Sequence, residues 1–278
     1  MAARDAVRLP GAQALPSRRD YLLLLSLGAI WGGSFFLIKL AIATVPPVTV
    51  AAGRILVGAL LLGAVLALRG MRLPQDRAVW ARLALMGTVG TVLPFALINW
   101  GETHIDSGLA AILMSAVPLL TIVLGHFLRS DEKITGGKAI ALVLGGAGVV
   151  VLVGPDALRG LGADLLGQLA VLGACACYAV NSLTARGLAR HPAEVVTFGM
   201  LAAAAVAAVP LSLLIDRPWQ LDISSLSLLA VLALGVLPTA LGYIIAFRII
   251  AGAGAGFASF NNYLVPVFGV LWGMALLG

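Results

Sequence analysis

Nine apolar stretches, each about as long as a bilayer is thick, follow one another along this chain with short loops between them. A helix needs about 20 apolar residues to cross a membrane. Backbone in lipid must satisfy its own hydrogen bonds, which an α-helix does. We therefore predict an all-α integral membrane protein. The predicted spans are 21–44, 48–68, 79–101, 106–128, 134–153, 163–188, 192–215, 225–249 and 255–277.

The composition excludes a water-soluble globule. Hydrophobic residues make up 61% of the chain and charged residues 11%, against about 25% charged residues in a soluble domain. The net charge of +6 comes from basic residues in short loops, so we expect no nucleic-acid partner. Cys175 and Cys177 are two positions apart on a predicted helix and point in different directions. We expect core packing for both thiols, and neither a disulfide nor a metal site.

The basic residues also predict the orientation. If the N-terminus lies in the cytoplasm, the inner segments hold 14 Lys and Arg residues and the outer loops only Arg159 and Arg217. Positive charge favours the cytoplasmic side of a membrane. We therefore predict a cytoplasmic N-terminus, with residues 1–20 as a tail. The apolar run of 21–44 is longer than the core of a cleaved signal and is read as a retained helix.

The second half of the chain weakly repeats the first. An offset of 148 residues aligns Gly87 with Gly235, Thr91 with Thr239, and Val117–Pro118 with Val265–Pro266, and gives nine identities over 87–128. Helical repeats of this kind are typical of secondary transporters. A unit of five helices places its second copy upside down, so we predict an inverted repeat. The units would be 21–153 and 163–278, joined by the loop 154–162, with a tenth helix expected beyond Gly278.

Three stretches carry a family resemblance. They are Ala29-Ile-Trp-Gly-Gly-Ser-Phe-Phe36, the segment from Ser107 through Pro118 to Thr135, and Ala253 to Phe268. The chain resembles the drug/metabolite transporter superfamily in its ten-helix EamA-type branch. Within that branch it is similar to the YddG-type bacterial exporters of aromatic and other amino acids. The resemblance implies a bacterial inner-membrane carrier with no cofactor.

Polar and aromatic residues inside the spans are candidates for a solute pathway, because such groups are costly in lipid. Trp31 and Ser34 share one helix face at i, i+3, and so do Tyr178 and Asn181. Asn261 and Asn262 point in different directions, and we favour Asn262 as the contact. The predicted substrate-binding residues are Trp31, Ser34, Asn99, Tyr178, Asn181, Tyr243, Asn262 and Tyr263. The alternative role for each is packing or hydrogen bonding between helices.

Charged and helix-breaking residues within the spans suggest further roles. Arg54 could extend its side chain to the outer surface or contact a substrate carboxylate, while outward extension is favoured for Lys39. Prolines interrupt backbone hydrogen bonding inside a helix. The candidate hinges are Pro94, Pro118, Pro238 and Pro266. The Gly28/Gly32 spacing is typical of close helix approach.

No Asp or Glu lies near the middle of a predicted span, and Glu102 and Asp106 fall at the outer edge. This argues against lipophilic cations as substrates. The sequence contains no phosphate loop, catalytic triad or paired carboxylates, so we expect no enzyme. The predicted function is export of small zwitterionic metabolites, most directly amino acids, by alternating access.

Two alternatives stay open. One is a carrier of nucleotide sugars or other metabolites, and the other is a membrane enzyme or a helix bundle without transport. The expected partners are the lipid bilayer and a small-molecule substrate. The oligomeric state is open, a monomer being one alternative.

Overall fold

The structure is a computed structural model that describes residues 16–128, 163–188 and 190–276, with short pieces between 134 and 147. No strand occurs in these ranges. The first half contains α1 (Arg18–Ala41), α2 (Pro47–Leu68), α3 (Arg77–Gly87), η1 (Thr88–Val92), α4 (Leu93–Gly101), α5 (Ser107–Leu113) and α6 (Ala116–Leu128). The second half contains α8 (Ala163–Ala185), η2 (Arg186–Leu188), α9 (Ala193–Ile215), η3 (Pro218–Gln220), α10 (Ser225–Leu234), η4 (Gly235–Leu241), α11 (Gly242–Ser259) and α12 (Asn261–Leu276).

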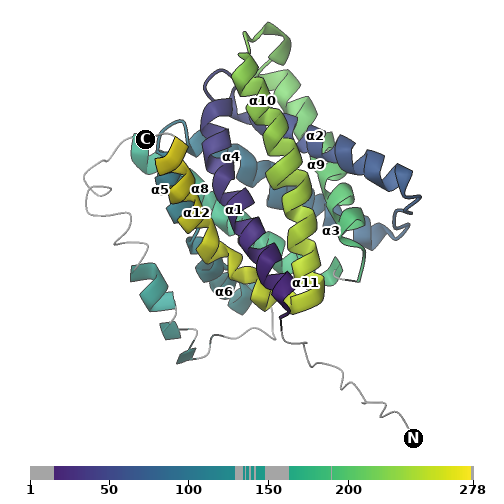
Figure 1. The fold of residues 1–278 in the computed structure, drawn as a ribbon, viewed down its shortest axis with the longest axis vertical. Helices are drawn as coiled ribbons and strands as arrows, with labels where there is room; N and C mark the ends of the chain where they lie inside the picture. The colour runs from purple at the N-terminus through teal and green to yellow at the C-terminus, as the bar shows by residue number, and fades with distance from the viewer. Residues whose placement is uncertain are drawn as a thin grey trace, which may run out of the picture.

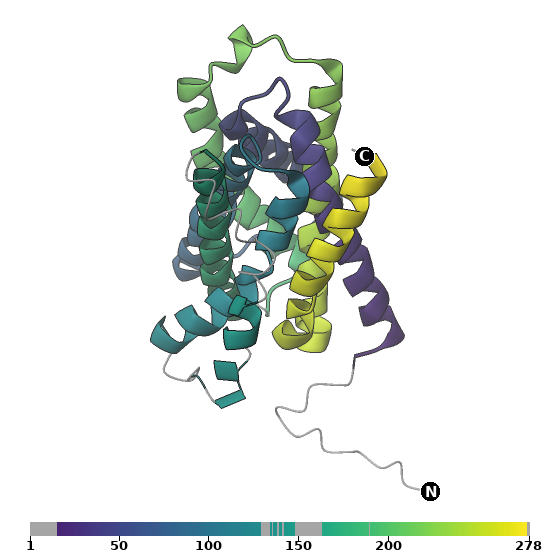
Figure 2. The same cartoon turned by 90° about the vertical axis from the view of Figure 1, so that its left-hand side faces the viewer.

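The helices form a bundle in which segments far apart in sequence lie side by side (Figures 1 and 2). Seven helical segments among the described residues are long and apolar enough to cross a membrane. The prediction of an all-α membrane protein is therefore confirmed. The predicted span 134–153 and the loop 154–162 lie, apart from short pieces, outside the described residues. So do residues 1–15 of the predicted tail.

The predicted gap between the last two spans, at 250–254, coincides with a break in the structure. The membrane-crossing segment that starts at Ser225 ends at Gly254, where the backbone of α11 is not helical. The helical turn after this break runs to Ser259, and α12 begins at Asn261. Gly254 has φ 88° and ψ 162°, a backbone conformation that glycine adopts without a Cβ clash. The chain therefore changes direction at a single glycine in an apolar stretch that contains no polar turn residue.

Two membrane-crossing segments share an unusual local structure at the positions aligned by the 148-residue offset. η1 and η4 are both π-helical, and each interrupts an α-helix. The hydroxyl of Thr91 donates to the carbonyl of Met86 at 3.0 Å, and that of Thr239 donates to the carbonyl of Leu234 at 2.7 Å. Each threonine thus bonds a carbonyl five residues earlier, in a turn whose regular hydrogen bonding is disturbed.

These two segments run in opposite directions. The ammonium of Lys39, near the end of α1, donates to the carbonyl of Glu102 just after α4. Ser227, at the start of α10, donates to the carbonyl of Leu40. The end of α4 and the start of α10 therefore lie on the same side of the bundle. Figure 1 shows α10 descending into α11 alongside the ascending α1.

Close contact between α1 and α12 depends on glycines. A Cβ on Gly32 would lie 2.6 Å from Cβ of Phe268 and 2.8 Å from the backbone nitrogen of Gly269. A Cβ on Gly28 would lie 2.7 Å from Cβ of Leu264. The small-residue spacing on α1 therefore lets two helix backbones approach closely.

Candidate functional site

A cavity of about 480 Å³ lies among helices from both halves of the chain. Most of the residues predicted from the sequence line it, and they come from α1, α2, α8, α11 and α12. These residues are Trp31, Ser34, Arg54, Tyr178, Asn181, Tyr243, Asn262 and Tyr263. The structure therefore brings them to one place, although their role as substrate contacts stays a prediction.

Aromatic side chains form one wall of the cavity. The indole nitrogen of Trp31 donates to the carbonyl of Pro238 in the π-helical η4 at 2.9 Å. The ring of Trp31 meets that of Tyr243 edge-on, with centroids 5.8 Å apart. Tyr243 in turn stacks on Phe247 at 6.3 Å. This wall offers an apolar surface whose orientation is fixed by ring packing and by one hydrogen bond.

Arg54 is the only Lys or Arg among the described residues that line the cavity. The residue is 4% exposed, so its side chain does not extend to the outer surface. Its Nε donates to the hydroxyl of Thr239 at 3.0 Å, and its guanidinium lies 3.8 Å above the ring of Phe95. No hydrogen bond or ion pair to its two terminal nitrogens is seen from the described part of the chain. The guanidinium is thus held in place on one side and available to a ligand.

Buried amides on two other helices also have unused hydrogen-bonding groups. The Oδ1 of Asn181 has no partner among the described residues, and neither does either polar atom of Asn261. The Nδ2 of Asn262 donates to the carbonyl of Ser259 at 3.1 Å. Asn261 and Asn262 both line the cavity, contrary to the expectation that only one would. Most buried polar groups are paired, so these atoms keep hydrogen-bonding capacity that the described residues do not use.

Asn99 lies outside the cavity. Its Nδ2 donates to the carbonyl of Pro47 at 3.0 Å, and this bond ties the end of α4 to the start of α2. Its neighbour Trp100 is 39% exposed and packs on His104, with ring centroids 4.3 Å apart. The structure thus gives Asn99 a contact between helices in place of a contact with the cavity.

Sequence reasoning missed Phe95 and Phe247, which line the cavity, and it ranked Asn262 above Asn261. Phe247 follows Tyr243 by one helical turn, so the i, i+4 spacing could have identified it. Nothing in the sequence marks Phe95 as the ring beneath Arg54, because that contact joins two separate helices.

The cavity reaches one side of the bundle and stops short of the other. Exposed residues at one end of it include Ser182, Ser259 and Tyr263, on the side where α1 begins. Towards the opposite side the lining ends at Ile38 and Ile98, which are both buried. Beyond them the ammonium of Lys39 bonds the carbonyls of Glu102 and Ile105 at 2.9 and 3.2 Å. The cavity is thus open on the side of the N-terminus and closed on the other.

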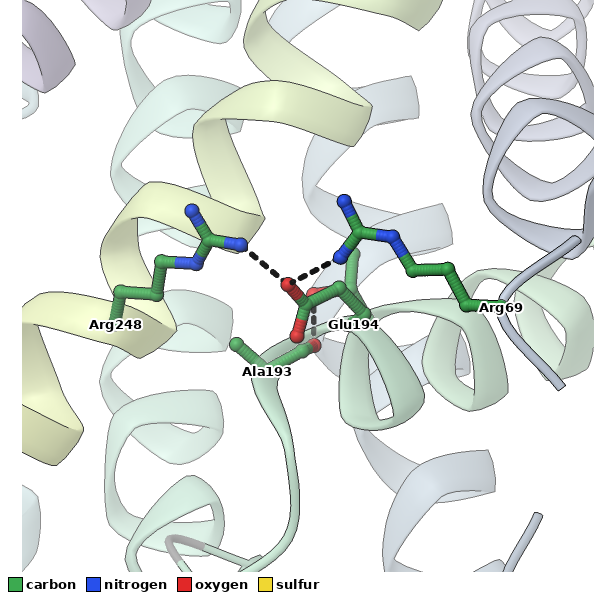
Figure 3. A network of polar contacts seen from close by, with 5 residues as sticks. Arg69, Ala193, Glu194 and Arg248 are labelled. Atoms are coloured by element: carbon green, nitrogen blue, oxygen red, sulfur yellow. Dashed lines mark hydrogen bonds and ion pairs between the residues drawn. The ribbon is translucent and has the colours of Figure 1, made fainter. Parts of the chain in front are cut away.

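An ion-pair network joins three helices on the open side (Figure 3). Glu194, at the start of α9, accepts a hydrogen bond from Arg248 of α11. The same carboxylate oxygen lies 3.7 Å from a terminal nitrogen of Arg69, which follows α2. The network joins the end of α2 and the start of α9 to the middle of α11.

The predicted hinge prolines occupy different settings. Pro94 lies at the start of α4 directly after η1, and Pro238 lies inside η4. Pro118 lies early in α6, shortly after the break at Met114 and Ser115, and Pro266 lies inside α12. Pro94, Pro118 and Pro238 therefore accompany irregular or first turns, whereas Pro266 lies within a continuous helix. Movement at all four stays a prediction.

Among the described residues, no group of His, Cys, Asp and Glu could hold a metal ion. Cys175 is buried and Cys177 half-buried, and neither forms a disulfide. The cavity as described is therefore lined by aromatic and aliphatic side chains together with amides, hydroxyls and one guanidinium.

A scan against protein-family models matches the EamA-like transporter family twice, over residues 19–154 and 165–278. The chain belongs to the EamA-like transporter family. The two matches cover most of the sequence, and they identify the protein as a multi-pass membrane transporter rather than an enzyme. The resemblance to EamA-type transporters seen in the sequence is confirmed.

Individual relatives are distant. An uncharacterized transporter of Bacillus subtilis, YoaV, is 22% identical over 252 residues, which are 90% of this chain and 86% of that protein. A probable terminal-alkyne amino-acid exporter of Streptantibioticus cattleyicolor is 26% identical over 215 residues, 75% of this chain and 69% of that one. A probable amino-acid metabolite efflux pump of Escherichia coli is 27% identical over 175 residues, 63% of this chain and 56% of that one.

A solved crystal structure shares the fold. It superposes with a TM-score of 0.67 and 23% sequence identity, and the match covers 93% of this chain and 89% of the solved one. The likeness therefore extends over the whole bundle and not over one repeat alone.

Proposed function

We propose that this protein exports small zwitterionic metabolites, most directly amino acids with aromatic or other apolar side chains, by alternating access. The observation that supports the proposal is that one cavity contains both a cation without an anionic partner and amide oxygens without a hydrogen-bond donor among the described residues. Arg54 presents a cation without a carboxylate partner, and Asn181 and Asn261 present buried amide oxygens without donors. An α-carboxylate and an α-ammonium are the groups that complement them.

The walls of the cavity suit the rest of such a molecule. Trp31, Tyr243 and Phe247 offer an apolar surface for a side chain. Sites for small molecules are typically apolar, with a few polar groups that fix orientation. Two relatives carry names that describe amino-acid or amino-acid-metabolite export, which supports the same class of substrate.

Alternating access is supported by the arrangement of the helices. The π-helical segments around η1 and η4 are aligned by the sequence repeat and run in opposite directions, as an inverted repeat requires. The cavity lies between the two halves and is open on one side only. With the N-terminus in the cytoplasm of a bacterial cell, the open side would face the cytoplasm, where an exporter takes up its solute.

A carrier of nucleotide sugars fits the cavity less well. A diphosphate needs several cationic contacts, whereas Arg54 is the single basic residue among the described lining residues. Competition by a nucleotide sugar for uptake of radiolabelled L-phenylalanine into proteoliposomes distinguishes this alternative from the proposal.

The decisive experiment compares two solutes that differ only in a carboxylate. Purified protein in proteoliposomes is assayed for exchange of radiolabelled L-phenylalanine, with unlabelled phenylalanine or phenethylamine as competitor. We expect phenylalanine to compete better by about 10- to 100-fold, since a hydrogen bond to a charged group contributes about 1.5–3 kcal/mol. The Arg54→Gln variant should lose this preference. Equal competition by the two solutes in the wild type, or an unchanged preference in the variant, would contradict the proposal.

A further inference from the structure

A buried carboxyl group lies at the closed end of the cavity. Glu102 directly follows α4, the last helix of the third membrane-crossing segment, and its side chain is fully buried. It lies one helical turn beyond Ile98, which lines the cavity.

The hydrogen bonds of Glu102 fit a protonated carboxyl. Its Oε2 lies 2.7 Å from the hydroxyl of Ser107, and that hydroxyl lies 3.2 Å from the carbonyl oxygen of Phe35. Ser107 has one hydroxyl proton for these two acceptors. If Glu102 is protonated, it donates to Ser107 and Ser107 donates to Phe35, so each contact has its own proton. The other oxygen, Oε1, is buried without a partner among the described residues, which is costly for a charged carboxylate.

None of the charged groups around Glu102 forms an ion pair with its carboxylate in the described part of the chain. From α1, the ammonium of Lys39 donates to backbone carbonyls, and no ion pair joins it to the Glu102 carboxylate in the described part of the chain. From α2, Arg54 bonds Thr239. The nearby loop carries two more titratable groups, His104 and the exposed Asp106.

The third neighbour, α8, brings no Asp, Glu, Lys or Arg in its described turns from 165 to 185. The titratable groups there are Cys175, Cys177 and Tyr178. Burial raises the pKa of Glu102 to about 8, against smaller opposing effects of the Ser107 hydrogen bond and of the charges on Lys39 and Arg54.

We propose that Glu102 is the proton-binding site of this carrier, and that protonation of its carboxyl closes the side of the protein opposite to the cavity mouth. The inference rests on the proposed function and adds a proton as the second transported species. While the side opposite to the cavity mouth is closed, the proton leaves Glu102 towards the cavity, which Phe35 and Ile98 both line. The charged carboxylate then favours opening of the closed side, where water can solvate it. A proton taken up from that side closes the protein again, so one solute leaves for each proton that enters.

Infrared spectroscopy of purified protein tests the site without any substrate. We expect a protonated carboxyl band near neutral pH that disappears as the pH rises through about 8. The band should be absent from Glu102→Gln and retained in Asp106→Asn, a matched change of an exposed acid on the same loop. A band that survives in Glu102→Gln, or no such band in the wild type, would overturn the proposal.

Transport gives the second test, with the amino acid that the wild type exchanges fastest. A lumen more acidic by one pH unit should stimulate wild-type uptake several-fold, since one proton per solute supports about a tenfold concentration ratio. Glu102→Gln should show no stimulation, and Asp106→Asn should behave as the wild type.

The two proposals fail separately. If the wild type exchanges amino acids without any response to the pH gradient, or responds only to an alkaline lumen, the result contradicts the proton site and leaves the proposed function unaffected. A wild type that exchanges no amino acid removes the proposed function, while the infrared titration still decides whether Glu102 binds a proton.

Discussion

At the scale of single residues, the cavity contains polar side chains that the fold leaves unsatisfied. Asn181 and Asn261 are examples, and each buried unpaired group costs about 1–3 kcal/mol. The sequence predicted Asn181 through its spacing from Tyr178, since a helix fixes which residues share a face. It left the direction of Arg54 open, because the depth and path of a long side chain depend on the neighbouring helices.

Replacement of Asn181 by leucine should stabilise the protein and abolish transport. Leucine has nearly the same shape, and it removes an unpaired buried amide, so the unfolding temperature in detergent should rise by an amount corresponding to about 1 kcal/mol. Solute exchange should fall at least tenfold if the amide contacts the ammonium. Asn99→Leu is the control. It too removes a buried oxygen without a partner among the described residues, but it also breaks the bond to Pro47, so it should not show the rise in unfolding temperature. Full exchange by Asn181→Leu would remove this residue from the site.

At the scale of secondary-structure elements, the length of the apolar stretches predicted most helices. The positions of the functional groups depend on irregular turns within those helices. The paired π-helical segments η1 and η4 hold Thr91 and Thr239, and Thr239 positions Arg54. The sequence repeat aligned the two threonines, yet hydropathy gave no sign of a π-helix. A local change of helix type depends on which carbonyls neighbouring side chains can satisfy.

Substitution of Gly32 by alanine should separate α1 from α12. The added methyl group would meet Phe268 and the backbone of Gly269, so we expect a loss of about 1–3 kcal/mol from overpacking. Thermal unfolding in detergent measures this loss. Gly273→Ala serves as the control, because a Cβ there meets nothing within 4 Å. Equal unfolding temperatures for the two variants would contradict the close packing of these helices.

At the scale of the whole molecule, the arrangement of charges predicts which side faces the cytoplasm. In a Cys175→Ala, Cys177→Ala background, Thr103→Cys should react with an impermeant thiol reagent in right-side-out membrane vesicles. Gln75→Cys should react only after the vesicles are opened. Both positions are exposed, and they lie at opposite ends of the third membrane-crossing segment. The reverse pattern of labelling would place the cavity mouth on the outer side.

The sequence by itself determined that the protein lies in a lipid bilayer, that it is all-helical, that it contains a repeat and to which family it belongs. Lipid requires long apolar helices, and a repeated unit has matching residues at a constant offset. Most of the binding residues that the sequence predicted also line the cavity. Only the tertiary structure decided that Asn99 lies outside the cavity, that Arg54 turns inward over Phe95, and that Glu102 is buried at the closed end. These are contacts between helices far apart in the chain, and their geometry follows from packing that no local pattern encodes.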